Sequence, residues 1–86
     1  MADYRVTFAR TARKELESLN VALVERMIKR IDGLAMEPRP HGCRKLSGDE
    51  NLRRIRVGDY RIVYAVFDRE RVVDVVRIRH RRDVYR

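Results

Sequence analysis

The spacing of the apolar residues changes from strand-like to helix-like close to the N-terminus. Residues 4–8 alternate between polar and apolar side chains, which predicts a short strand. From about Arg10 a helical stripe begins, formed by Ala12, Leu16 and Leu19. Asn20 breaks this helix and is a suitable N-cap for a second one, which Pro38 and Pro40 end. The second helix has i, i+3 and i+4 spacing at Val24, Met27, Ile28, Ile31, Leu34 and Ala35.

Three strand-like runs follow a turn-rich connection at residues 38–51. The runs cover residues 52–57, 60–67 and 72–79, and only short links separate them. Links of this length join antiparallel neighbours, so we expect two successive hairpins. The pattern predicts an α+β fold of one strand, two helices and three strands, with a small, mainly antiparallel sheet and a helical hairpin on one face. We expect residues 1–86 to form a single domain.

Side-chain alternation separates an apolar face of this sheet from a basic one. Ile55 and Val57 point to one side of their strand, and Arg54 and Arg56 point to the other. If the helices cover the apolar side, the residues that can converge on the opposite side are Arg54, Arg56, Arg61 and the C-terminal tail. The alternative is that these arginines only solubilise an exposed sheet face.

The charge balance supports a polyanionic partner. The chain of 86 residues is 40% charged and 44% hydrophobic, with a net charge of +8. Residues 1–50 carry ten Lys or Arg against eight Asp or Glu, whereas residues 51–86 carry eleven Arg against five acids. The C-terminal part is therefore the candidate anion-binding surface, and its partner is either nucleic acid or an acidic protein.

Other residue types predict what the protein lacks. Cys43 stands alone, and the two histidines, His41 and His80, lie far apart in the sequence, so the chain offers a poor metal-binding set. No apolar run approaches the ~20 residues of a membrane span. We expect a cytoplasmic protein with no cofactor, no metal and no membrane partner.

The last ten residues collect the side chains that cleavage of an RNA phosphodiester requires. Arginines can hold phosphate, a histidine can move a proton near neutral pH, and an aromatic ring can stack on a base. Residues 77–86 contain all three types, including His80 and Tyr85.

Three segments resemble a known family. They are Lys45-Leu46-Ser47-Gly48, the run LRRIRVGDYRIVY at residues 52–64, and the run IRHRRDVY at residues 78–85. Together they resemble the RelE/ParE superfamily of toxins from type II toxin–antitoxin systems, and the tail resembles the RelE branch.

The resemblance to the RelE branch implies a ribosome-dependent mRNA endonuclease that a partner protein holds inactive. Members of this branch cut mRNA in the ribosomal A site by attack of a 2′-hydroxyl on the adjacent phosphate, without metal. The partners it implies are a cognate RelB-like antitoxin and a ribosome with mRNA in the A site. It also allows the toxin–antitoxin complex to bind operator DNA through the antitoxin.

The resemblance assigns roles to individual residues. Arg54 and Arg56 position the RNA backbone, although the best-known RelE pattern has lysines there. Because arginine stays protonated, neither can readily act as general base, and His80 takes that role in our interpretation. The expected catalytic residues are Arg61, His80, Arg81 and Tyr85. The expected RNA-binding residues are Arg54, Arg56, Arg79 and Arg82.

Two other functions are compatible with this sequence. ParE-type toxins share the fold but act on DNA gyrase as protein-binding poisons without RNase activity. A basic nucleic-acid-binding module without chemistry is the third possibility, and there His80 is a strand-end histidine bonded to the backbone.

Overall fold

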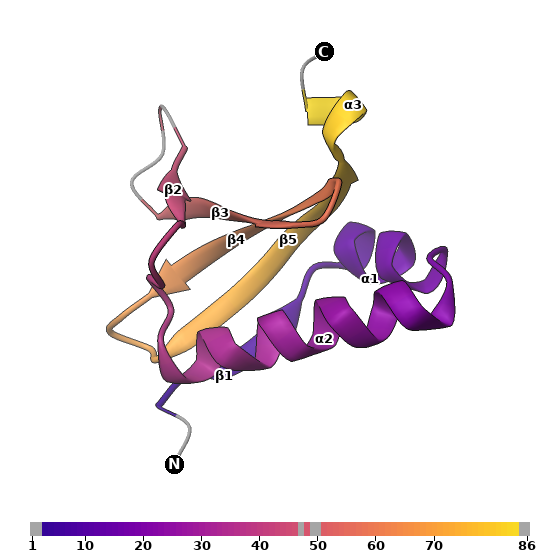
Figure 1. The fold of residues 1–86 in the computed structure, drawn as a ribbon. Coiled ribbons are helices and arrows are strands. Elements are labelled where there is room, and N and C mark those ends of the chain that lie inside the picture. Colours follow the sequence, from indigo (N-terminus) through magenta and orange to yellow (C-terminus); the bar gives the residue numbers. More distant parts are fainter. Residues whose placement is uncertain (1–2, 47, 49–50, 85–86) are drawn as a thin grey trace.

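The computed structural model describes residues 3–46, 48 and 51–84, and of residues 83 and 84 only the backbone (Figure 1). Its elements in chain order are β1 (Arg5–Phe8), α1 (Arg10–Glu17), α2 (Val21–Met36), β2 (Arg44–Lys45), β3 (Leu52–Val57), β4 (Tyr60–Phe67), β5 (Val72–His80) and α3 (Arg81–Val84).

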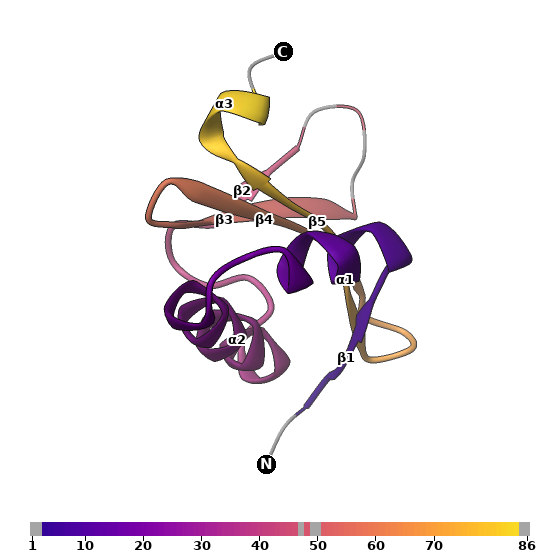
Figure 2. The same cartoon turned by 90° about the vertical axis from the view of Figure 1, so that its right-hand side faces the viewer.

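The strands form one sheet in the order β1-β5-β4-β3-β2. β1 runs parallel to β5, and every other neighbouring pair is antiparallel. Helices α1 and α2 lie together on one side of the sheet, and α3 projects from the end of β5 toward the other side (Figures 1 and 2). The predicted α+β fold, with a helical hairpin on one face of a mainly antiparallel sheet, is confirmed.

Two short elements fall where the sequence predicted none. β2 lies inside the connection predicted as turns, and its two residues pair with Arg53 and Arg54 of β3. Helix α3 begins directly after β5, in the segment that the sequence showed only as a basic tail. Elements this short have no hydrophobic period of their own, because the neighbouring strand or the preceding element places them. β5 also extends one residue further than expected, to His80.

The core lies between the two helices and the face of the sheet that they cover. Its largest fully buried side chains are Tyr64, Met27, Ile31, Leu34, Ile55, Ile62, Val73 and Val75. Each aliphatic side chain buried in this way contributes roughly 1.5–3 kcal/mol relative to an exposed one. These interactions hold the sheet against α2, so that its opposite face is free to present polar groups.

Both ends of α2 are fixed by groups that satisfy backbone donors or redirect the chain. The Asn20 side chain accepts a hydrogen bond from the N–H of Leu23 at 2.9 Å, which confirms the predicted N-cap. After α2 ends at Met36, the Tyr64 hydroxyl donates to the carbonyl of Pro38 at 2.8 Å. Burial raises the pKa of Tyr64, so this hydroxyl remains a donor.

β5 contains one irregularity in its pairing with β4. Val63 pairs with Arg77, whereas the next residue of β4, Tyr64, pairs with Val75, so Val76 is an extra residue in β5. A bulge of this kind reverses the alternation of side chains beyond it. Glu15 of α1 stabilises the segment after the bulge, because it accepts from the N–H of Ile78 at 2.8 Å and from the guanidinium of Arg77 at 3.0 Å.

A second polar cluster joins the β4–β5 turn to two distant segments. Asp68 accepts a hydrogen bond from the Tyr4 hydroxyl at 2.6 Å and pairs with Arg39 at 2.7 Å. The hydrogen bonds from Arg39 and Tyr4 lower the pKa of Asp68 to about 2. The ionised form of this carboxylate is therefore favoured in the folded protein.

This shift predicts how stability depends on pH. An unfolded Asp titrates near ~3.9, so the contribution of Asp68 is present above that pH and is lost as the pH falls toward 2. Asp68→Asn should lower the urea midpoint at pH 6, and the difference from wild type should shrink by pH 2. Arg39→Gln should give the same pattern. A difference that is equal at both pH values would contradict the role assigned to this carboxylate.

Candidate nucleic-acid interface

Three arginines from three neighbouring strands lie side by side on the face of the sheet that the helices leave open. Arg56 of β3 pairs with Arg61 of β4, and Arg61 pairs with Arg79 of β5. Directly opposed residues on adjacent strands point to the same face, with Cβ atoms roughly 5 Å apart. We call Arg56, Arg61 and Arg79 the arginine row.

Two local features place the row. Gly58 takes a φ of +60°, as the first central residue of a type II′ turn does, and this tight turn sets Arg56 opposite Arg61. The bulge at Val76 then turns Arg79 outward while Ile78 remains in the core. Without the extra residue, continued alternation from the buried Val75 would point Arg79 toward the helices.

The row concentrates positive charge on one face of the sheet. Like charges directly opposite each other on neighbouring strands are destabilising. Three arginines outside the row, Arg39, Arg71 and Arg77, form ion pairs with Asp68, Asp3 and Glu15. Arg56 is exposed, Arg79 is half-buried, and the Nη1 atom of Arg61 is buried. Such an arrangement suits a polyanionic ligand, whose phosphates would offset the repulsion.

Two further cations extend this face toward the sheet edge. Arg54 lies two residues from Arg56 on the same side of β3, and Arg44 of β2 pairs directly with it. Arg54 belongs to the predicted RNA-binding set, but Arg44 does not. The signal that could have identified Arg44 is its adjacency to Lys45 in an otherwise turn-rich segment, although pairing with β3 is what brings it to the basic face.

His80 lies on the other side of the sheet. It pairs with Tyr60, which in turn pairs with Val57 of the core face. The rings of Tyr60 and His80 meet edge to face with centroids 5.1 Å apart, and Nδ1 of His80 accepts from the backbone N–H of Arg82 at 3.2 Å. His80 lines a cavity of about 390 Å³ next to the N-terminal part of α2. The register therefore does not bring His80 into the arginine row.

The remaining predicted site residues, Arg81, Arg82 and Tyr85, come after β5 in the chain. Arg81 and Arg82 are exposed at the start of α3, and the backbone N–H of Arg81 donates to the carbonyl of Asp59 at 2.7 Å. This bond holds α3 against the β3–β4 turn. Tyr85, the fourth expected catalytic residue, lies outside the described residues. The geometry thus groups Arg56, Arg61 and Arg79 most closely, with Arg81 and Arg82 near the end of the same sheet.

Two further properties concern the described segments as a whole. In residues 3–46, 48 and 51–84, no group of three or more His, Cys, Asp or Glu side chains is placed to hold a metal ion. Among the helices that these residues form, none combines the length and the apolar composition needed to cross a bilayer.

The fold and the arginine row together define a small α+β protein with one basic sheet face. A family model described as "ParE toxin of type II toxin-antitoxin system, parDE" matches residues 6–85. Toxin RelG of Mycobacterium tuberculosis is 34% identical over 87 residues, which cover 96% of this chain and 97% of that toxin. The chain belongs to the RelE/ParE superfamily of toxins of type II toxin–antitoxin systems.

Solved structures of the same superfamily share the fold. A chain of the archaeal RelE–RelB complex from Pyrococcus horikoshii superposes with a TM-score of 0.82 at 33% identity, covering 92% of this chain and 96% of that chain. A chain of the intact RelBE toxin–antitoxin complex of E. coli has a TM-score of 0.80 at 29% identity, covering 90% and 95%. The resemblance of the sequence to this superfamily is confirmed.

Two arginines of β5 have different surroundings: Arg79 belongs to the arginine row, whereas Arg77 forms an ion pair with Glu15. We expect Arg79→Gln to weaken binding of a single-stranded 2′-O-methyl oligoribonucleotide and to make its salt dependence shallower by about 0.7 for each phosphate that is no longer bound. Arg77→Gln, the matched control, removes the ion pair with Glu15 and should lower the melting temperature by up to about 5 °C. Its salt slope should stay at the wild-type value. Equal slopes for the two variants would disprove the assignment of the basic face.

Proposed function

We propose that this toxin is a ribosome-dependent mRNA endonuclease of the RelE type. The observation that carries the proposal is the arginine row, in which Arg56, Arg61 and Arg79 oppose one another across three strands. Like charges set directly opposite one another repel, and bound phosphates would offset that repulsion. The 34% identity to Toxin RelG supports the choice of the RelE branch.

The arginines hold the RNA strand and stabilise the reacting phosphate in this proposal. Arg61 and Arg79 contact phosphates from neighbouring strands, where the RNA approaches the end of the sheet, and Arg54 and Arg56 position the adjoining backbone. Arg81, which directly follows His80, contacts the reacting phosphate from the start of α3, and Arg82 adds positive charge beside it. Guanidinium groups suit this task because they donate two parallel hydrogen bonds and keep their charge throughout the reaction.

Cleavage requires a proton acceptor as well as positive charge. The 2′-hydroxyl loses its proton to His80 and its oxygen bonds to the adjacent phosphorus. The bond from phosphorus to the 5′-oxygen breaks, and that oxygen then takes up a proton. The products are a 2′,3′-cyclic phosphate and a 5′-hydroxyl. Nδ1 of His80 accepts from the backbone N–H of Arg82, so the neutral imidazole carries its proton on Nε2. His80 therefore takes the 2′-hydroxyl proton at Nδ1, once the RNA displaces this hydrogen bond. RNA must cross the end of the sheet to reach it, and Tyr85 stacks on or orients the nucleotide.

The proposal includes a biological setting, which the class of protein supports. The toxin acts in the cytoplasm on a ribosome with mRNA in its A site, and a RelB-like antitoxin holds it inactive. Chains similar to this one have been solved in RelE–RelB and RelBE complexes, which supports a protein antitoxin as partner. The complex binds operator DNA through the antitoxin.

Single-turnover cleavage on programmed ribosomes separates proton transfer from charge stabilisation. His80→Ala should slow cleavage by about 10²–10⁴-fold with little change in ribosome binding, as expected when a general base is lost. The rise of the rate with pH that a histidine base produces between about pH 5 and 8 should disappear. Arg61→Ala should also slow cleavage but should keep the rise, because arginine does not titrate in this range.

Arg61→Lys is the matched variant for the charge. It should recover only part of the rate that Arg61→Ala removes, since a lysine cannot reproduce a bidentate phosphate contact. If His80→Ala cleaved at the wild-type rate with an unchanged pH profile, His80 would be structural and Tyr85 would be the next candidate base.

The description of the matching family model supports one alternative, a ParE-like poison of DNA gyrase without RNase activity. Such a protein would cause gyrase-linked DNA breaks in cells and leave mRNA intact. We expect no such breaks on expression of this chain, and their appearance without mRNA cleavage would favour the alternative.

A further inference from the structure

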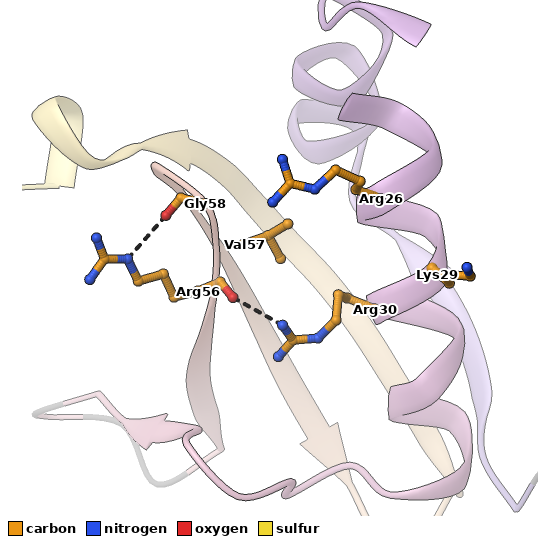
Figure 3. Close-up of a pocket in the computed structure, with 6 residues that line it drawn as sticks. All are labelled: Arg26, Lys29, Arg30, Arg56, Val57 and Gly58. Atoms are coloured by element: carbon orange, nitrogen blue, oxygen red, sulfur yellow. Dashed lines mark hydrogen bonds between the residues drawn. The ribbon is translucent and has the colours of Figure 1, made fainter. Parts of the chain in front are cut away.

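A cleft between α2 and the β3–β4 turn carries positive charge that the proposed reaction does not use. Its volume is about 270 Å³, and its lining residues are Arg26, Lys29, Arg30, Arg56, Val57 and Gly58. Figure 3 shows Arg26 and Arg30 extending from α2 toward the turn, whereas the side chain of Arg56 extends to the other side of β3. We call this site the α2 cleft.

The two arginines that enter the α2 cleft lie against the end of β3 and its turn. A Cβ atom at Gly58 would lie 3.3 Å from the Nη2 atom of Arg26, so the glycine lets this guanidinium lie close against the backbone. The Nη1 atom of Arg30 donates to the carbonyl of Arg56 at 3.2 Å. Because a guanidinium has five N–H donors, most of those on Arg30 remain available to a ligand.

The charge of the α2 cleft is poorly balanced. Arg26, Lys29 and Arg30 lie within five residues of α2, and the i, i+4 spacing of Arg26 and Arg30 places these two on one face, whereas Lys29 extends away from the turn (Figure 3). Within the described segments, none of the three takes part in an ion pair. The two cavities that share Arg26 with the α2 cleft each include one carboxylate, Asp59 in one and Glu25 in the other. An exposed helix face could be solvated, but here two guanidinium groups point into a concave space rather than into bulk water.

The α2 cleft adjoins the cavity that contains His80. Arg26 and Gly58 line both spaces, and the second also includes Tyr60 and His80. The end of β3 and its turn therefore lie between the Arg56 side chain on one side and those of Arg26 and Arg30 on the other (Figure 3). A strand that crosses the end of the sheet to reach His80 would enter the α2 cleft next.

We propose that the α2 cleft binds backbone phosphates of RNA, with Arg26 and Arg30 as the phosphate ligands. The inference rests on the proposed function, because it takes RNA as the polyanion that reaches His80. The RNA is either the strand that is cut or ribosomal RNA beside it, and both offer the same phosphate chemistry.

An acidic protein segment fits this cleft less well. A peptide that adds to a sheet edge needs exposed backbone groups, but Arg30 already occupies the carbonyl of Arg56 at the edge of β3. Two guanidinium groups that point into the same space, those of Arg26 and Arg30, instead match the regularly spaced phosphates of a nucleic-acid backbone. The edge-to-face pair of Tyr60 and His80 adds an aromatic surface near the same path, on which a base can stack.

Salt-dependent binding tests the α2 cleft directly. The double variant Arg26→Gln/Arg30→Gln should give a salt slope shallower by about 1.4 than wild type, at about 0.7 for each phosphate bound. The probes are a 2′-O-methyl oligoribonucleotide, which lacks the attacking hydroxyl, and ribosomes with an empty A site. Arg26→Gln alone, which removes no hydrogen bond of the described chain, should give about half the effect. The matched control is Arg13→Gln/Lys14→Gln, with the same reduction of charge on the exposed surface of α1.

The two probes distinguish the source of the phosphates. A shallower slope with both probes supports contact with the substrate strand, and a shallower slope with ribosomes alone supports contact with ribosomal RNA. A slope equal to that of the control pair would overturn the proposal. So would weaker binding of poly-L-glutamate by the variant with unchanged RNA binding, because the cleft would then serve an acidic protein.

The outcome is independent of the proposed cleavage. If the wild-type protein cuts mRNA but the cleft variants match the control, only the cleft assignment fails. If the wild-type protein does not cut mRNA, the endonuclease proposal fails, and the salt slopes still report whether the α2 cleft holds phosphate.

Discussion

The bulge in β5 is the constraint on which the rest of the structure depends. One extra residue, Val76, reverses the alternation of side chains, so Val75 and Ile78 both enter the core while Arg77 and Arg79 turn outward. Glu15 holds the segment after the bulge from α1, where it bonds the backbone N–H of Ile78 and the guanidinium of Arg77. A single hydrogen-bonded carboxylate thus links the packing of α1 to the position of the basic face.

This arrangement divides the molecule into a part that stabilises it and a part that opposes folding. The apolar face of the sheet packs on α1 and α2, and among the residues that the structure describes no buried one is polar or charged. The opposite face carries the arginine row, whose mutual repulsion the core must offset. Active and binding sites often retain interactions that lower stability, because the ligand supplies the missing opposite charge.

Much of this could be predicted from the sequence, and the failures have physical causes. The spacing of apolar residues located both long helices, the Asn20 cap and four of the strands, because each has a period of its own. The pairing of Arg79 with Arg61 could not be predicted by counting residues outward from the β4–β5 turn, because a strand pair without a bulge would have set Arg61 opposite Ile78. The interruption in the apolar pattern between Val75 and Ile78 was the available signal. Likewise, Arg26 and Arg30 look like a solvated helix face until β3 is seen to pack beside them.

In the proposed function, the arginine-lined sheet face makes this toxin an enzyme that acts on translated mRNA. Primer extension on a chosen transcript, in cells that express the wild-type chain and then the Arg61→Gln variant, tests it most directly. We predict cuts within translated codons, in register with the reading frame, that disappear when a stop codon blocks translation upstream and weaken strongly in the variant. Intact transcripts during growth arrest by the wild-type chain would contradict the claim.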